Sequence, residues 1–100
     1  MSNMDEMAHR IKSMSPHEKL ELGQAIGRLR EFLGKSQRDI YEHADLSIPK
    51  STYANIERTG GAQPSQVIKA LELLGTDVDR ILAWYRGARE ALDDALGKEA

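Results

Sequence analysis

Signals that begin and end helices recur along this 100-residue chain, and they limit it to an all-α fold. The stretch SPHE at residues 15–18 is a capping box, with an N-cap serine, proline at the first helical position and glutamate three residues after the cap. Glycines at positions 34, 60, 61 and 75 are typical helix stops. Between these signals apolar residues recur at helical spacing, and in the second helix they are Leu22, Ala25, Ile26, Leu29, Phe32 and Leu33. We predict helices over residues 4–12, 16–33, 36–44, 50–59, 64–74 and 76–96.

Composition indicates a single domain. An apolar content of 40% is enough for one modest core. The absence of cysteine excludes a disulfide framework, a thiolate nucleophile and a Cys-based zinc site. Residues 1–15 carry charges in place of an apolar signal-peptide core, and no segment is long and apolar enough to span a bilayer. We expect a cytoplasmic protein with no membrane contact, built from a short N-terminal helix or arm (1–14), a core domain (15–82) and a C-terminal helical extension (83–100).

Charge is unevenly distributed along the chain. The net charge is −2, whereas a nucleic-acid binder is usually basic. Residues 24–69 nevertheless hold seven Lys or Arg against five Asp or Glu, so the middle of the chain is mildly basic and the two ends are acidic.

Two short helices joined by a proline-containing break stand in this basic middle. Pro49 belongs to the break, because proline lacks an N–H to donate and disfavours helical geometry in the residue before it. The helix that follows turns Tyr53 and Ile56 to one side. Its other side is polar and consists of Ser51, Thr52, Asn55, Arg58 and Thr59. Such a pair of helices matches a helix-turn-helix, which lays its second helix in the major groove of DNA.

The side-chain chemistry of this second helix suits base edges. Asparagine can pair with adenine, lysine or arginine with guanine, and serine or threonine with several partners. We predict base reading by Lys50, Ser51, Thr52 and Asn55. A helix start such as that at Gln37 suits a phosphate. The expected phosphate contacts come from Gln37, Arg38, Lys35, Arg58 and Thr59.

Residues 23–82 resemble a known family, the lambda-repressor-like, Xre/Cro-type helix-turn-helix proteins. The resemblance rests on LREFLGKSQRDI, on YANIER, and on QPS followed by IKALELLGTDVDRIL, which recur in the family's order. It implies a compact bundle of five helices, here with an extra short N-terminal helix and an extended C-terminal helix. It also implies that Gln37 contacts phosphate and that the helix from Lys50 reads bases.

The chain departs from the family pattern at the turn. Asp45 stands where the family usually has glycine, and the spacing from Gln37 to Glu57 is about two residues longer than the family's common pattern. Either Leu46 or Ile48 could therefore fill the buried turn position.

Arg30 and Glu57 match a structural ion pair of the family, between the first core helix and the end of the recognition helix. We therefore assign Glu57 a structural role. Truncating one partner of a buried pair costs about 3 to 5 kcal/mol, so a loss of binding in such a variant would report unfolding first.

The last predicted helix carries a short heptad-like pattern. Val78, Tyr85 and Leu92 repeat every seven residues, with Ile81 and Ala88 between them. One interpretation is that its first turns complete the core and the remainder is an exposed helix. The other is that it forms a symmetric dimer interface through Trp84, Tyr85, Leu92 and Leu96.

Nothing in the sequence supports an enzyme. His17-Glu18 resembles the start of a zinc-protease motif, but Glu21 stands where the second histidine must be. His9 and His43 have no companions at ligand spacing. We therefore expect no catalytic residues, no metal and no cofactor.

The predicted function is that of a sequence-specific transcriptional regulator of double-stranded DNA, a repressor that binds a pseudo-palindromic operator as a homodimer. The chain has no room for a small-molecule effector domain. A phage-type repressor, a restriction-modification controller and an autoregulating antitoxin all fit. The alternative is an antitoxin or protein-interaction module that keeps the fold and binds a protein partner through its acidic termini.

Overall fold

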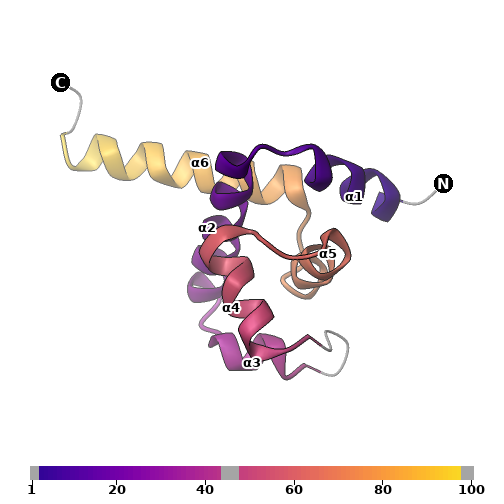
Figure 1. The fold of residues 1–100 in the computed structure, drawn as a ribbon. Coiled ribbons are helices and arrows are strands. Elements are labelled where there is room, and N and C mark those ends of the chain that lie inside the picture. Colours follow the sequence, from indigo (N-terminus) through magenta and orange to yellow (C-terminus); the bar gives the residue numbers. More distant parts are fainter. Residues whose placement is uncertain (1–2, 44–47, 98–100) are drawn as a thin grey trace.

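The computed structural model describes residues 3–43 and 48–97, except for the side chains of residues 3, 4 and 92–94. This part of the chain is all-α, as predicted, and contains no strand. Figure 1 shows the arrangement of the helices, which are α1 (Asn3–Ser13), α2 (Pro16–Phe32), α3 (Gln37–Tyr41), α4 (Lys50–Thr59), α5 (Pro64–Leu73) and α6 (Val78–Ala95).

Local capping explains where the helices begin. The hydroxyl of Ser15 accepts from the Glu18 N–H at 3.2 Å, and the Ser15 N–H donates to the Glu18 carboxylate at 2.9 Å. Ser36 and Asp39 form the same reciprocal pair at the start of α3. These two capping boxes confirm the predicted starts of α2 and α3.

The third helix is shorter than predicted. It ends at Tyr41, and the predicted end near Ala44 falls outside the described residues. The physical reason is a tightened last turn, in which the His43 N–H donates to the Ile40 carbonyl three residues back.

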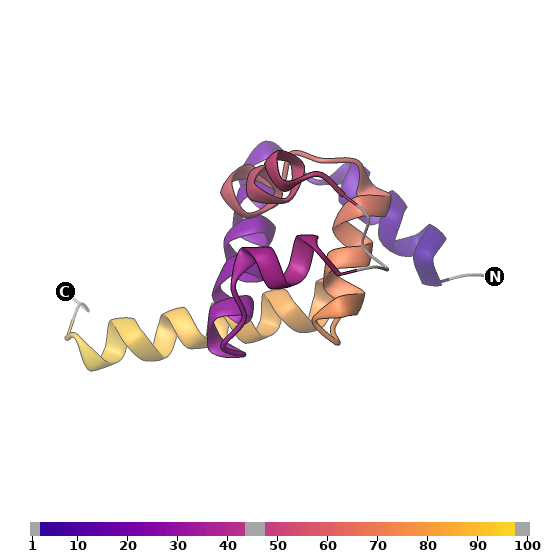
Figure 2. The same cartoon turned by 90° about the horizontal axis from the view of Figure 1, so that it is seen from below.

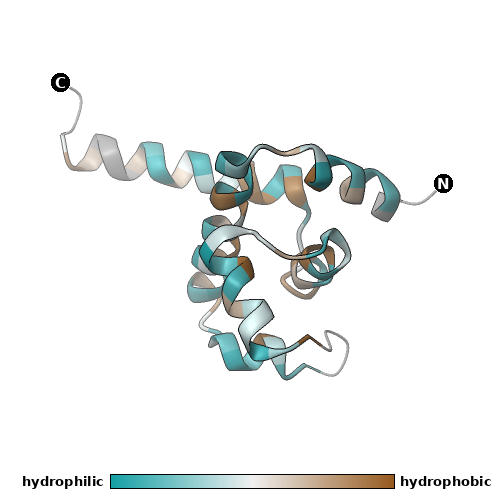
Figure 3. Cartoon of the chain, viewed as in Figure 1, coloured by the Kyte–Doolittle hydropathy of each residue, from teal (hydrophilic) through white to brown (hydrophobic). Residues whose placement is uncertain are grey.

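The core lies where α2, α4, α5 and the start of α6 meet, and Figure 3 shows hydrophobic segments of these helices turned toward one another. Its largest fully buried side chains include Tyr53, Ile26, Ile56, Ile68 and Leu71. The predicted apolar stripe of α2 is wrong at its end, because Phe32 is 74% exposed and Leu33 is 45% exposed. Phe32 lies at the edge of this stripe, on the side of α2 that meets Trp84 of α6, and Leu33 follows the last turn of α2.

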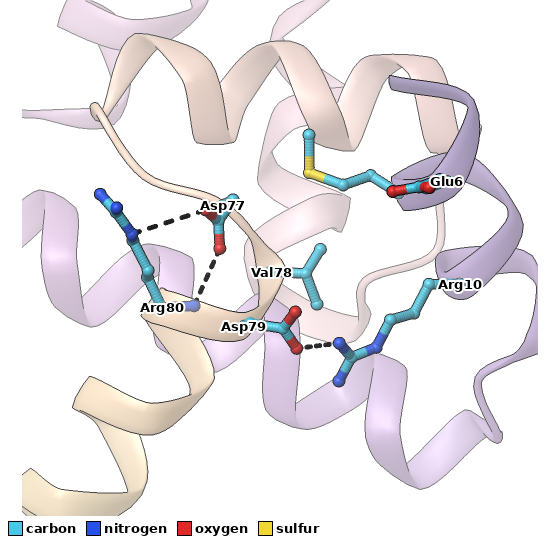
Figure 4. A pocket seen from close by; sticks show the side chains of 7 residues that line it. Glu6, Arg10, Asp77, Val78, Asp79 and Arg80 are labelled. Atoms are coloured by element: carbon cyan, nitrogen blue, oxygen red, sulfur yellow. Dashed lines mark hydrogen bonds and ion pairs between the residues drawn. The ribbon is translucent and has the colours of Figure 1, made fainter. Parts of the chain in front are cut away.

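The N-terminal helix packs into this core. Ile11 and Met14 are buried, and α1 lies along α5. Arg10 of α1 also forms an ion pair with Asp79 at the start of α6 (Figure 4).

Helices α2 and α4 approach each other through glycines. A Cβ at Gly23 would lie 2.2 Å from the carbonyl oxygen of Ile56, and a Cβ at Gly27 would lie 2.9 Å from Oε1 of Glu57. Gly60, which ends α4, has φ +71°, and its Cβ would lie 2.1 Å from the carbonyl oxygen of Lys19. The spacing of Gly23 and Gly27, one helical turn apart, therefore serves close packing inside the monomer.

Gly60→Ala should destabilise the fold by about 3 kcal/mol or more, because it combines left-handed backbone strain of about 1 to 2 kcal/mol with overpacking of about 1 to 3 kcal/mol. Gly75→Ala is the matched control: Gly75 has φ +79° with nothing within 4 Å of its Cβ, so only the strain remains. Urea unfolding of both variants measures how much unfolding free energy each one loses. Equal losses of unfolding free energy would contradict the close approach of Gly60 to α2.

The last helix extends away from the other helices. Its first turns pack on α2 and contribute Val78, Ile81 and Leu82 to the core. Figures 1 and 2 both show the second half of α6 projecting beyond the rest of the molecule. The described side chains from Arg86 to Ala91 are exposed.

Candidate functional site

Helix α4 presents a polar face to solvent and an apolar face to the core. Tyr53 and Ile56 are fully buried. Lys50, Ser51, Arg58 and Thr59 are exposed, whereas Thr52 and Asn55 are half-buried. The helix has the predicted bounds, with Pro49 as its N-cap and Gly60 as its C-cap. Its outward face therefore combines hydroxyl, amide and cationic groups on a short, rigidly seated helix.

An ion pair holds α4 against α2. Arg30 Nε donates to Glu57 Oε2 at 2.6 Å, and Arg30 Nη2 donates to Glu57 Oε1 at 3.1 Å. The two side chains are 11% and 10% exposed. Arg30 Nη1 also donates to the Lys35 carbonyl at 2.7 Å, so the same guanidinium fixes the loop before α3. This is the pair that the family resemblance implied.

Gln37 belongs to this network as well. Its amide nitrogen donates to Glu57 Oε1 at 2.9 Å, which ties the start of α3 to α4. Sequence reasoning assigned Gln37 to phosphate contact and missed this bond, because the two residues lie 20 positions apart. One N–H of the Gln37 amide is thus engaged by Glu57, and a phosphate contact would use the second N–H of the same nitrogen.

The network keeps Glu57 ionised. Burial alone would raise the pKa of this carboxyl, but hydrogen bonding, led by Arg30 and including Gln37, outweighs burial and lowers it below its ordinary value. The neighbouring Tyr53 hydroxyl is buried, and burial together with the Glu57 charge raises its pKa far above the ordinary value. Both groups therefore keep one charge state over the physiological pH range.

Asn55 is engaged within its own helix end. Its amide nitrogen donates to the Gly61 carbonyl at 2.7 Å, and its amide oxygen accepts from Arg58 Nη2 at 2.9 Å. Thr59 completes this cap, since its hydroxyl donates to the Asn55 carbonyl at 3.2 Å and accepts from the Gly61 N–H at 3.1 Å. Asn55, a predicted base reader, thus supports the Gly60–Gly61 turn in the free protein.

The remaining candidates for phosphate contact lie near the start of α3. Arg38 is exposed and pairs with Glu42 one turn later, Nε to Oε2, at 2.9 Å. Lys35 is exposed in the preceding loop. At the turn before α4, Ile48 is buried, whereas Asp45 and Leu46 fall outside the described residues.

A second surface feature is an apolar groove between α2 and α6, which we call the Phe32–Trp84 groove. The rings of Phe32 and Trp84 lie 6.0 Å apart between centroids, at 59°. The groove is lined by Arg28, Glu31, Phe32, Trp84, Tyr85, Ala88 and Arg89.

The residues predicted for a dimer interface are placed differently from one another. Leu96 is 64% exposed and Trp84 is half-buried in the groove. Tyr85 is only 8% exposed, and its hydroxyl donates to Gln24 Oε1 at 3.2 Å, so it offers little surface to a partner. The side chain of Leu92 lies outside the described residues. The exposed Phe32 was missed, because the pattern assigned it to the core.

A hollow also lies between α1 and the start of α6, but it offers neither the polar helix face of α4 nor the apolar surface of the Phe32–Trp84 groove. Its charges pair with each other, Arg10 with Asp79 and Arg80 with Asp77 (Figure 4). Within residues 3–43 and 48–97, apart from the side chains of residues 3, 4 and 92–94, no three His, Asp or Glu side chains form a group that could hold a metal ion. In the same part of the chain, no helix has both the length and the apolar character needed to cross a membrane.

Comparisons with known proteins supply no relative for this arrangement. A scan against protein-family models, a search of curated proteins and a search of solved structures each found no significant match.

Proposed function

We propose that the chain is a sequence-specific transcriptional regulator, a repressor of the lambda-repressor-like helix-turn-helix type that binds a pseudo-palindromic operator as a homodimer. The observation that carries the proposal is α4, a short helix with an exposed polar and cationic face, held on α2 by the mostly buried Arg30–Glu57 pair. A helix that enters the major groove needs both properties, because its side chains must reach base edges while its own position stays fixed.

The exposed residues divide into two roles under this proposal. Lys50, Ser51 and Thr52 at the start of α4 read bases, since the N-terminal residues of a recognition helix contact base edges. Lys35 and Arg38 near the start of α3, together with Arg58 and Thr59 at the end of α4, are exposed and contact phosphates. Asn55 joins the base readers by exchanging its Gly61 hydrogen bond for a base, and Gln37 donates to a phosphate.

Selection of bound duplexes from a random library at physiological salt tests the proposal. We expect an inverted repeat with half-site centres about 34 Å apart, one helical turn of DNA. Ser51→Ala should relax the sequence preference at the position that Ser51 reads, at a cost of about 1 to 3 kcal/mol in binding. Ser51 is exposed, so this variant should unfold at the same urea concentration as the wild type.

Lys69→Ala on the exposed side of α5 is the control, because it removes a positive charge outside the proposed interface. Its selected motif should match that of the wild type. A folded wild-type protein that selects no motif would contradict the proposed function.

The alternative is a protein-interaction module, and the net charge of −2 together with the Phe32–Trp84 groove favours it. Salt dependence separates the two functions. Affinity for DNA falls steeply as salt rises, because each phosphate contact releases a counterion, whereas an apolar protein interface is much less sensitive.

A further inference from the structure

We propose that Glu42 is an internal competitor of DNA: its carboxylate holds the Arg38 guanidinium in the free protein and opposes the binding of a phosphate there. The proposal rests on the DNA binding of the proposed function and adds an autoinhibitory contact to the same surface. Its effect is a lower affinity for duplexes of every sequence, because a phosphate contact carries no sequence information.

Carboxylates occupy two of the groups that are expected to contact phosphate near the start of α3. Arg38 Nε donates to Glu42 Oε2 at 2.9 Å. The Gln37 amide nitrogen donates to Glu57 Oε1, also at 2.9 Å. Carboxylate and phosphate oxygens accept from the same charged donors. The free protein therefore has anions of its own at this surface.

The two carboxylates differ in what they do for the fold. Glu57 is mostly buried and also accepts from Arg30, so it holds α4 on α2. Glu42 and Arg38 are both mostly exposed. An exposed ion pair contributes little to stability, because water and salt weaken it. Glu42 is therefore the carboxylate that a phosphate can displace while the fold stays intact.

Helix stability does not account for a negative charge at position 42. Glu42 is the C-cap residue of α3, and the C-terminal end of a helix carries partial negative charge that disfavours an anion. The pair also has the less favourable order, because an acid four residues before a base stabilises a helix more than the reverse. An effect on what binds Arg38 explains the charge of Glu42 better than an effect on α3.

Competition follows from the chemistry of the guanidinium. A phosphate can meet the Nη groups of Arg38, but it then lies beside the Glu42 carboxylate. Two anions on one guanidinium repel each other, so either Glu42 rotates away or the phosphate contact is weakened. Both results lower the affinity for DNA, and the loss is largest at low salt, where neither charge is screened.

Glu42→Gln measures this loss, because glutamine keeps the size of the side chain and removes its charge. The variant should bind duplex DNA about two- to fivefold more tightly at low salt. The gain should be the same on the duplex recovered by selection and on a scrambled duplex. The slope of log K against log salt should become steeper by up to about 0.9, because Arg38 then meets its phosphate without first leaving a carboxylate. Fluorescence anisotropy of labelled duplexes gives these affinities.

Two further variants separate local competition from net charge. Glu72→Gln on the exposed side of α5 changes the net charge by the same amount outside the proposed interface, and it should leave the affinity unchanged. Arg38→Gln removes the group for which Glu42 competes. Adding Glu42→Gln to Arg38→Gln should therefore give little further gain, which a double-mutant cycle measures. Urea unfolding checks that each variant keeps its fold.

Each outcome decides the proposal. Tighter binding of Glu42→Gln to both duplexes, with little gain in the Arg38→Gln background, supports it. A gain that Glu72→Gln reproduces, that persists without Arg38 or that occurs on the selected duplex alone overturns it, as does no gain. In these cases the wild type still reads its operator, so the proposed function stands.

The reverse result is also distinguishable. A wild type that selects no motif, but binds any duplex more tightly after Glu42→Gln, would refute the sequence-specific function and keep the competition. A folded wild type that binds no duplex would overturn both.

Discussion

Replacing Gly23 with alanine should destabilise the protein by about 3 kcal/mol, although alanine is the better helix former by about 1 kcal/mol. The added Cβ would lie 2.2 Å from the Ile56 carbonyl oxygen and 2.9 Å from the Gly60 nitrogen, and both are backbone atoms. The clash can be relieved only if α2 and α4 move apart. This movement would also disturb the Arg30–Glu57 pair, so the loss of unfolding free energy should be at the upper end of the range for overpacking.

Gly87→Ala is the matched control in a second helix. Gly87 lies inside α6 with nothing within 4 Å of its Cβ, so only the helix preference acts there. This variant should be more stable than the wild type by about 0.5 to 1 kcal/mol. Urea unfolding followed by circular dichroism, at one protein concentration, gives both values. Stabilisation of both variants would contradict the close approach of α2 and α4.

Replacing Glu57 with glutamine should destabilise the protein by about 1 to 3 kcal/mol at neutral pH, because the mostly buried Arg30 guanidinium then keeps only the exposed Glu31 carboxylate, 3.8 Å away, as a counter-charge. The cost should depend on pH. The folded pKa of Glu57 is lowered, so its contribution is fully present above the ordinary glutamate value of 4.5 and is lost as the pH falls through the lower folded value. The unfolding free energies of wild type and variant should therefore converge below pH 4.5.

Glu42→Gln tests the same chemistry at the surface. Arg38 and Glu42 pair at 2.9 Å but are 74% and 55% exposed, so this change should cost less than about 1 kcal/mol. A pH series of denaturant titrations on the three proteins separates the two pairs. If Glu57→Gln and Glu42→Gln lose the same unfolding free energy, the Arg30–Glu57 pair is as accessible to water in solution as the Arg38–Glu42 pair.

Local sequence signals predicted the helices well, because caps and stops act within a few residues. Pro49 and Gly60 bound α4 where the pattern placed them, and the capping boxes at Ser15 and Ser36 begin α2 and α3. The third helix was predicted too long. Its tightened last turn depends on the backbone around Ile40 and His43, which no residue pattern specifies.

Contacts between distant residues were the part that sequence periodicity could not supply. The helical period placed Phe32 on the inner face of α2, but it carries no information on how far the neighbouring helix α6 covers that face. The bonds of Glu57 to Gln37 and of Glu21 to Arg86 join residues 20 and 65 positions apart. Pairing Arg30 with Glu57 came from the family resemblance and not from the spacing of the two residues.

The candidate site shows the same limit at Asn55. Its outward position on α4 followed from the helical period, and this placement suggested a base reader. Its amide instead meets the Gly61 carbonyl, because the Gly60 turn folds the chain back over the helix end. A helical wheel ends at the last residue of its helix and so cannot include that turn.

The contacts that hold α4 on α2 have an evolutionary consequence. Gly23, Gly60, Arg30 and Glu57 bear on folding, whereas Lys50 and Ser51 are exposed and lie outside these contacts. Under the proposed function, substitutions at positions 50 and 51 can change the preferred operator with little effect on stability. Under the same proposal, descendants of this chain can acquire new DNA targets through drift at these two positions. Purifying selection then acts on the residues that hold α4 on α2.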